Sequence, residues 1–148
     1  MLMRRWICVL SAFLTLFAAT EALSAQDRRP DAPGQGSGFT LEQNRPNPFN
    51  AETVIPFTLW DDLFVDGTVP RVSIQIFNFI QQQVGTPVAL GHVSGDGQRM
   101  ELLEYTQPGS YQAFWDGTDH LGRQVALGVY YVKMTVNGRT TIKKILKT

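Results

Sequence analysis

Short apolar runs with a two-residue period occupy the chain from residue 39 onward. Ile55, Phe57 and Leu59 share one parity of their segment, and the same alternation returns in residues 72–76 and 130–136. A period of two is that of a β-strand with one buried face. Gly, Pro, Asn and Asp separate the runs, and no stretch has a convincing helical period. The pattern predicts an all-β sandwich or barrel whose strands are nearly all antiparallel.

Several segments carry more specific expectations. Residues 84–93 hold one strand or two short ones broken near Thr86-Pro87, and residues 99–104 pair with them across the turn at 94–97. Asn137-Gly138 is a two-residue hairpin signal.

The last strand, residues 139–147, loses its alternation between Ile142 and Ile145, so we expect a β-bulge there. Pro56 lacks a backbone donor, which places the strand around it at a sheet edge or leaves it paired on one side only.

One core is expected from the residues that share the buried parity. The predicted members are Ile55, Phe57, Leu59, Val72, Ile74, Ile76, Tyr111, Ala113, Trp115, Val125, Tyr130, Val132 and Met134. About 110 residues suffice for one domain that buries roughly two-thirds of its unfolded surface.

The first 25 residues have the layout of a secretory signal peptide. Arg4 and Arg5 precede an apolar run over residues 6–19, and small residues follow at 22–25. Cleavage after Ala25 leaves 123 of the 148 residues. The alternative is an uncleaved N-terminal anchor. We expect an exported protein in the periplasm, on the outer-membrane surface or outside the cell, with no transmembrane span after cleavage.

Residues 26–38 are expected to form a flexible linker, because they contain Pro, Gly and charged side chains but no large apolar side chain. The domain then covers residues 39–148. Cys8 is the only cysteine and lies in the predicted signal, so the mature chain has neither a disulfide nor a thiol nucleophile. Eleven basic and twelve acidic side chains remain after cleavage, a balance that does not favour nucleic acid as a partner.

Side-chain patterns of an enzyme are scarce. His92 and His120 are the only histidines, they lack a metal-ligand spacing, and no serine lies in a GxSxG elbow. Asp61 and Asp62 are adjacent, and a solvated acidic loop explains them better than a catalytic pair. We expect a non-enzymatic protein without a cofactor.

The glycine-rich segment 116–122 allows two interpretations. Asp116 and Asp119 lie three residues apart and offer oxygen ligands for a calcium ion. The remaining ligands of an EF-hand are missing, however. We therefore favour a turn in which both carboxylates bond to the backbone of their own loop.

Four ordered segments have a distinctive composition. Residues 41–50 read LEQNRPNPFN and lead into TVIPFTL, with Phe49 best explained as a plug over one end of the sandwich. Residues 72–78 read VSIQIFN, residues 115–130 begin WDGTD, and residues 143–147 read KKILK. The motif residues are Asn47, Pro48, Phe49, Asn50, Trp115, Asp116, Gly117, Asp119, Gly122, Gly128 and Tyr130.

These segments, in this order, resemble the C-terminal sorting domain of type IX secretion cargo. That module is related to the Ig-like domain of the flagellar hook-capping (FlgD-type) protein. The resemblance implies an antiparallel Ig-like β-sandwich, of about seven to eight strands by the alternation above. It also implies recognition by outer-membrane export or attachment machinery. The alternative is a free-standing structural or adhesive envelope protein that assembles through its strand edges.

In the related sorting domains the C-terminal region is what the machinery recognises, so we place the candidate recognition surface on the last strand. Its members are Lys143, Lys144, Ile145, Leu146 and Lys147, with Phe114 as a further apolar contact. The final ten residues contain four bases and no acid, whereas residues 42–66 contain five acids and one base. An equally weighted alternative is that the lysines only protect an edge strand from aggregation.

Overall fold

The computed structural model describes residues 38–148, and the predicted signal peptide and nearly all of the predicted linker lie outside the described residues. The elements are β1 (Phe39–Leu41), β2 (Thr53–Leu59), η1 (Asp61–Gly67), β3 (Arg71–Asn78), β4 (Gln83–Gly85), β5 (Val88–Leu90), β6 (Leu103–Glu104), β7 (Gly109–Trp115), β8 (Gly128–Val136) and β9 (Arg139–Lys147). Within residues 38–148, no helix has the length and apolar character needed to cross a bilayer.

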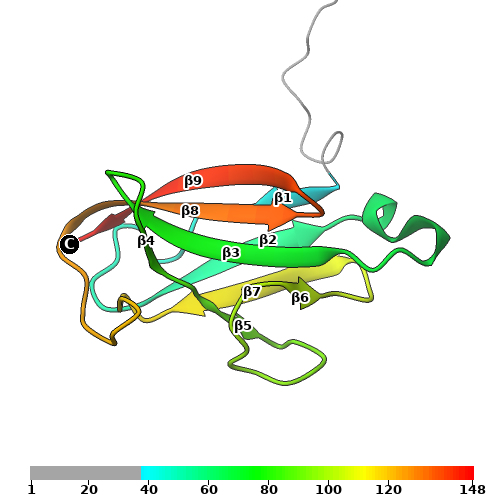
Figure 1. Cartoon of the computed structure of the whole chain (residues 1–148), viewed down its shortest axis with the longest axis horizontal. Coiled ribbons are helices and arrows are strands. Elements are labelled where there is room, and N and C mark those ends of the chain that lie inside the picture. Colours follow the sequence, from blue (N-terminus) through cyan, green and yellow to red (C-terminus); the bar gives the residue numbers. More distant parts are fainter. Residues whose placement is uncertain (1–37) are drawn as a thin grey trace, which may run out of the picture.

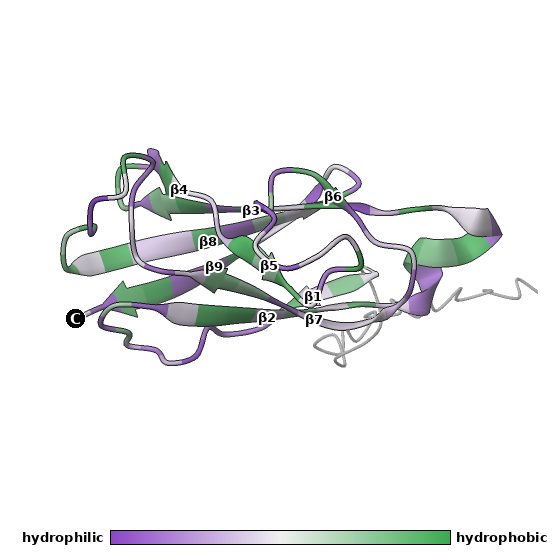
Figure 2. Ribbon diagram, turned by 90° about the horizontal axis from the view of Figure 1, so that it is seen from below, coloured by the Kyte–Doolittle hydropathy of each residue, from purple (hydrophilic) through white to green (hydrophobic). Residues whose placement is uncertain are grey.

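Two antiparallel sheets face each other (Figure 1). The first has the order β1-β2-β7-β5; the second has the order β4-β3-β8-β9, with β6 beside β3. Hydrophilic and hydrophobic residues alternate along the strands (Figure 2). The expected antiparallel sandwich is confirmed. The described residues form nine strands rather than seven or eight, and the unpredicted β1 has only three residues, too few to show an alternation.

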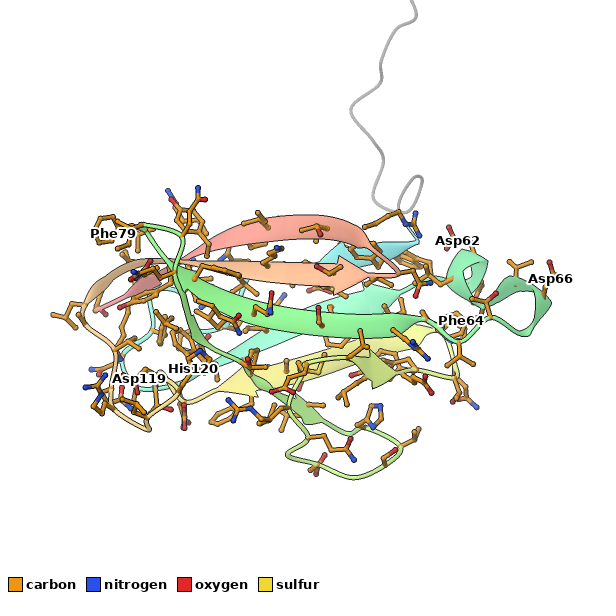
Figure 3. All side chains as sticks on the ribbon, in the orientation of Figure 1. Asp62, Phe64, Asp66, Phe79, Asp119 and His120 are labelled. Atoms are coloured by element: carbon orange, nitrogen blue, oxygen red, sulfur yellow. The ribbon has the colours of Figure 1, made fainter. Side chains whose placement is uncertain are left out.

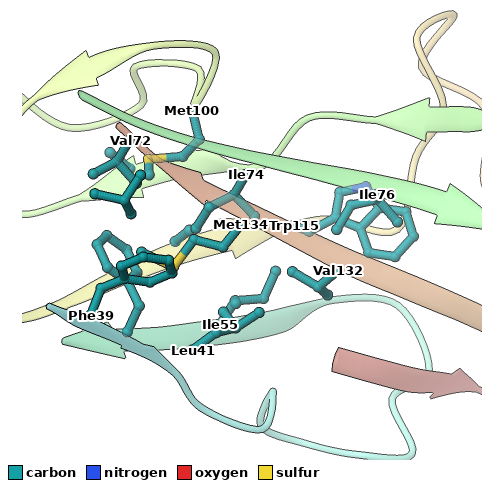
Figure 4. Packing of buried hydrophobic residues seen from close by; sticks show 14 of the residues in the cluster. Phe39, Leu41, Ile55, Val72, Ile74, Ile76, Met100, Trp115, Val132 and Met134 are labelled. Carbon is teal, nitrogen blue, oxygen red and sulfur yellow. The ribbon is translucent and has the colours of Figure 1, made fainter. Parts of the chain in front are cut away.

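The core lies between the sheets (Figure 4). Eleven of the thirteen predicted core residues are buried, and Tyr111 and Val125 are partly buried against them. Buried residues that the alternation did not predict come mainly from short or irregular segments. They are Phe39, Leu41, Leu63, Ala89, Met100, Tyr105, Val136 and Ile145.

The expected bulge in β9 is wrong. Residues 139–147 pair with β8 in one unbroken register. Ile142 and Ile145 differ by three positions, so they lie on opposite faces of a regular strand: Ile145 is 1% exposed and Ile142 is 56% exposed. The register shift in this sheet lies instead between Ile76 and Phe77, opposite β4.

The expectation for Pro56 holds only in part. Strand β2 is an inner strand, paired along its full length with β7. On its other side the β1 ladder ends at the pair between Leu41 and Phe57, the residue next to Pro56. The missing donor of Pro56 therefore coincides with the end of one ladder rather than with a sheet edge.

The middle of the chain confirms two short strands, β4 and β5, broken at Thr86-Pro87. Only one bridge, Val88 to Arg99, crosses the turn that follows, and β6 pairs with β3 in the other sheet. The hairpin between β8 and β9 is confirmed, with φ of 48° at Asn137 and 81° at Gly138.

Candidate recognition surface

Three aromatic rings from two motif segments, 41–50 and 115–130, meet at one end of the sandwich. The ring centroids of Phe49 and Trp115 lie 5.5 Å apart, and those of Trp115 and Tyr130 lie 5.8 Å apart. Phe49 is 1% exposed, which agrees with its expected role as a plug. The Tyr130 hydroxyl donates to the Ala126 carbonyl at 2.7 Å, and burial raises the pKa of Tyr130. Residues distant in sequence therefore form one packed unit.

The loop after Trp115 uses its carboxylates internally, as the turn interpretation predicts. Asp116 Oδ1 accepts from the Thr118 amide at 3.0 Å and from the Thr118 hydroxyl at 2.6 Å. Asp119 accepts from the Leu121 amide at 2.8 Å and from the Arg123 guanidinium at 2.8–2.9 Å. The hydrogen bonds from Arg123 hold the pKa of Asp119 below its usual value. Among residues 38–148 no three His, Cys, Asp or Glu side chains gather as a metal site.

Gly117 allows this loop to approach the segment after Phe49. Its φ is +71°, and a Cβ at this position would lie 2.4 Å from the Ala51 carbonyl oxygen. Gly122 and Gly128 also have positive φ, of 75° and 144°. Glycine is the residue that tolerates both the close approach and these backbone angles.

The C-terminal half of β9 is held by residues 43–50. The Phe49 amide donates to the Leu146 carbonyl at 2.9 Å, and the Thr148 amide donates to the Phe49 carbonyl at 2.8 Å. The Leu146 amide donates to Asn47 Oδ1 at 3.0 Å, and Gln43 Nε2 donates to the Lys144 carbonyl at 3.0 Å. Pro48 lies between the two anchoring residues, in a cis peptide bond with Asn47. The outer edge of β9 is therefore occupied from Lys144 to Thr148.

Lys147 is part of this anchor and not of an exposed surface. It is 5% exposed, and its Nζ lies 5.1 Å from the centroid of the Phe49 ring. The same Nζ donates to the Asn50 carbonyl and, at 3.2 Å, to Gln124 Oε1. Lys147 thus joins β9 to the segment after Phe49 and to the loop after Trp115.

The six residues of the candidate recognition surface therefore do not form one face. Ile145 belongs to the core and Lys147 to the anchor, so neither is available to a partner. Phe114 is half-buried on the outer side of β7, in the other sheet. Lys144 is exposed, Leu146 is 38% exposed and Lys143 is half-buried. The exposed part of the prediction reduces to Lys144 and Leu146, because half-buried Lys143 shares the parity of Ile145 on the opposite side of β9.

The face on which Lys144 and Leu146 lie includes residues that the sequence prediction omitted. Ile142 shares their parity on β9, and the register places Lys144 opposite Tyr131 of β8. Tyr131 in turn lies opposite Phe77 of β3. We call Ile142, Lys144 and Leu146 the β9 face. A prediction that continues the alternation unbroken through residues 139–147 places Ile142, Lys144 and Leu146 on one face.

One half of the β9 edge is open. The backbone groups of Leu146 point away from β8, since they bond to Asn47 and Phe49, and Ile142 has the same orientation because alternate residues of an antiparallel strand do. Among residues 38–148 no strand pairs with β9 on that side. The edge is thus unpaired around Ile142.

The β9 face is basic. Four ion pairs are formed within the described part of the chain, and Lys144 takes part in none of them. Lys133, opposite Ile142 on β8, lies with its Nζ 5.5 Å from the centroid of the Phe77 ring. The positive charges here are left without acidic partners from residues 38–148.

The two histidines occupy different settings. His92 is 8% exposed, with Nε2 at 2.9 Å from the Glu104 carbonyl and Nδ1 accepting from the Ser94 amide at 3.2 Å. Both ring nitrogens are thus used in holding the structure. His120 is exposed and lines a cleft of about 340 Å³ together with Arg99, Asp116 and Asp119.

No protein-family model matches the chain, and no curated protein matches it. Two solved structures are similar. One is dimeric latent PorU from Porphyromonas gingivalis, with 18% identity, a TM-score of 0.47, and coverage of 77% of this chain and 10% of that one. Another is the alkylpurine DNA glycosylase AlkC from Pseudomonas fluorescens bound to DNA containing an abasic site analog, with 13% identity, a TM-score of 0.40, and coverage of 76% and 31%. This chain spans about a tenth of the first structure and under a third of the second.

Proposed function

We propose that the protein is an exported, non-enzymatic recognition module of the type IX sorting-domain class. It docks through the β9 face onto outer-membrane export or attachment machinery. The observation that carries this proposal is the anchoring of β9 by Asn47 and Phe49, which leaves Lys144 and Leu146 exposed.

The motif residues that carry the resemblance support the proposal by their arrangement. Asn47 and Phe49 bond to the backbone of Leu146, and Lys147 bonds to the carbonyl of Asn50. Trp115 packs against Phe49, with the ring centroids 5.5 Å apart. The motifs thus cooperate to fix one strand, the strand that the resemblance associates with recognition.

The chemistry of the β9 face suits a protein partner. An apolar pair, Ile142 and Leu146, flanks the exposed amine of Lys144 on one regular strand. Charges at the margin of such a surface favour encounter and orientation of the partner, while the apolar side chains contribute affinity. A partner with acidic groups around an apolar patch fits this face.

The absence of catalysis is part of the proposal. Both nitrogens of His92 have backbone partners, and the carboxylates of Asp116 and Asp119 bond to their own loop. These hydrogen bonds hold the backbone of the surrounding loops, which supports a structural role for these three residues.

The test compares surface delivery with folding. A Lys144→Gln/Leu146→Ser variant is expected to keep its melting temperature within a few degrees and to lose most of its delivery to the outer membrane or medium. Arg99→Gln, which removes an exposed charge on a distant loop, is the matched control. Normal delivery of the first variant contradicts the proposal.

A second function has one observation in its favour. The β9 edge is open around Ile142, and an unpaired edge is a template for pairing with another chain. A structural or adhesive envelope subunit that assembles through this edge uses the same strand. Assembly that persists after surface delivery and is abolished by Ile142→Pro favours this alternative.

A further inference from the structure

An apolar groove lies on the outer face of the second sheet, beside the β9 face. It has a volume of about 490 Å³ and is lined by Phe77, Phe79, Gln81, Tyr131, Lys133 and Ile142. Phe79 is 75% exposed and Ile142 is 56% exposed. Large apolar side chains gathered in one exposed concavity are typical of an interaction site. We call these six residues the groove.

The groove has a positive rim and no acidic lining. Lys133 stands over Phe77, and Lys144 is opposite Tyr131 in the neighbouring strand. Every outward residue of β8 and β9 is neutral or basic. An occupant with negative charge around an apolar centre therefore complements it.

The chain itself has a surface with negative charge around an apolar centre. Element η1 projects from the sandwich with Asp61, Asp62 and Asp66 exposed and with Val65 56% exposed between them. No ion pair or side-chain hydrogen bond within residues 38–148 engages the three carboxylates. We call residues 60–67 the acidic tip; Trp60, 41% exposed, is its remaining apolar surface.

The acidic tip is held in one conformation. Leu63 is buried at its base, and the Leu63 amide donates to the Trp60 carbonyl at 3.1 Å. Asp66 and Gly67 turn the backbone with φ of 57° and 73°, and the Thr68 amide donates to the Val65 carbonyl at 3.1 Å. A rigid projection loses little conformational entropy when it docks.

The tip lies at one end of the molecule, and the groove extends from the middle of the second sheet, at Lys133 and Ile142, toward the opposite end. Figure 3 shows Asp62 and Asp66 at one end and Phe79 at the other. The tip of a chain is therefore remote from its own groove, and a contact between them joins two different copies.

We propose that this protein self-associates head to tail, with the acidic tip of one copy seated in the groove of the next. Val65 and Trp60 contact Phe79 and Ile142, while the tip carboxylates face Lys133 and Lys144. Such a contact uses two different patches, so each added copy leaves one tip and one groove free, and the rotation between copies decides between a closed ring and an open filament. This inference does not depend on the proposed export function.

Sedimentation of the purified protein tests the proposal. The protein is expressed from its full sequence and purified after export. The average mass is expected to rise between about 10 µM and 1 mM, as for a small interface, and to fall on raising the ionic strength. Asp61→Lys/Asp62→Lys alters the tip and Phe79→Glu alters the groove, and each is expected to weaken association at least tenfold. Leu121→Glu, at an apolar residue 74% exposed in a different loop, is the control and is expected to associate normally.

A mixture of the tip variant and the groove variant distinguishes a head-to-tail contact from a symmetric contact between two copies. The tip variant keeps an intact groove and the groove variant keeps an intact tip, so a mixture is expected to form 1:1 pairs and nothing larger. A protein that stays monomeric to 1 mM, or association unaffected by both variants, overturns the proposal. So does a mixture that forms no pairs although each variant retains the far-ultraviolet spectrum and melting curve of the parent. Surface delivery is not measured in this experiment, so its outcome leaves the export proposal to its own test.

Discussion

Phe49 and Leu146 are joined through their backbones although 97 positions separate them in the chain: the amide of Phe49 donates to the carbonyl of Leu146 at 2.9 Å. The next residue of β9, Lys147, places its amine over the Phe49 ring. This relationship fixes the end of the last strand against the beginning of the domain. It explains why residues from both ends of the sequence belong to one structural unit.

Replacing Trp115 by Ala is expected to destabilise the protein by about 3–5 kcal/mol, as for other large aromatic core residues. Trp115 is 2% exposed and packs against both Phe49 and Tyr130. Chemical denaturation measures this loss. A change below about 1 kcal/mol is typical of a surface residue and contradicts the packing described here.

Lys147 and Lys144 are expected to respond differently to the same substitution. Lys147→Met keeps the contact with Phe49 but removes the donor to Asn50 and Gln124, so a cost of about 1–3 kcal/mol is expected. Lys144→Met, at an exposed position, is expected to change stability by less than about 0.5 kcal/mol. Urea denaturation measures the loss of unfolding free energy for each variant. Equal losses for the two variants contradict the anchor role of Lys147.

Arg123→Gln is expected to raise the pKa of Asp119. The Arg123 guanidinium now favours the ionised carboxylate, so the pKa of Asp119 in the folded protein lies below its value in the unfolded chain. The stability that this bond contributes is therefore present above the unfolded pKa and is lost as the pH falls through the folded pKa. Titration of the Asp119 carboxyl carbon by NMR, with Arg71→Gln as control, measures the shift; an unchanged pKa refutes the assigned cause.

Most of the fold was predictable because alternation reports burial directly in long antiparallel strands. The predicted core residues of β2, β3 and β8 are all buried for that reason. Short segments gave no such signal, as β1 shows. The odd spacing of Ile142 and Ile145 indicates a bulge only if both side chains face inward, and Ile142 faces outward.

The recognition surface was predictable only in part. Sequence placed it on the last strand, but the anchoring of Lys147 depends on acceptors 97 and 23 positions away. No local pattern reveals such partners. The groove escaped prediction for a similar reason, since it combines a turn residue, Phe79, with side chains from three strands.

Export is expected to remove the first 25 residues. The motivation is the small residues at 22, 24 and 25 after an apolar run. The intact mass of the protein recovered from the periplasm or medium decides the matter. A protein that still begins at Met1 contradicts the signal-peptide interpretation and supports the N-terminal anchor.

The central claim is that a partner in the outer membrane contacts the β9 face, and site-specific photo-crosslinking in living cells tests it most directly. A photoreactive residue at position 144 or 146 is expected to form crosslinks to a component of the export or attachment machinery, identified by mass spectrometry. The same residue at position 93 or 121, two exposed apolar positions away from β9, is the control and is expected to form none. Crosslinks to that machinery from the control positions, with none from positions 144 and 146, would contradict the account.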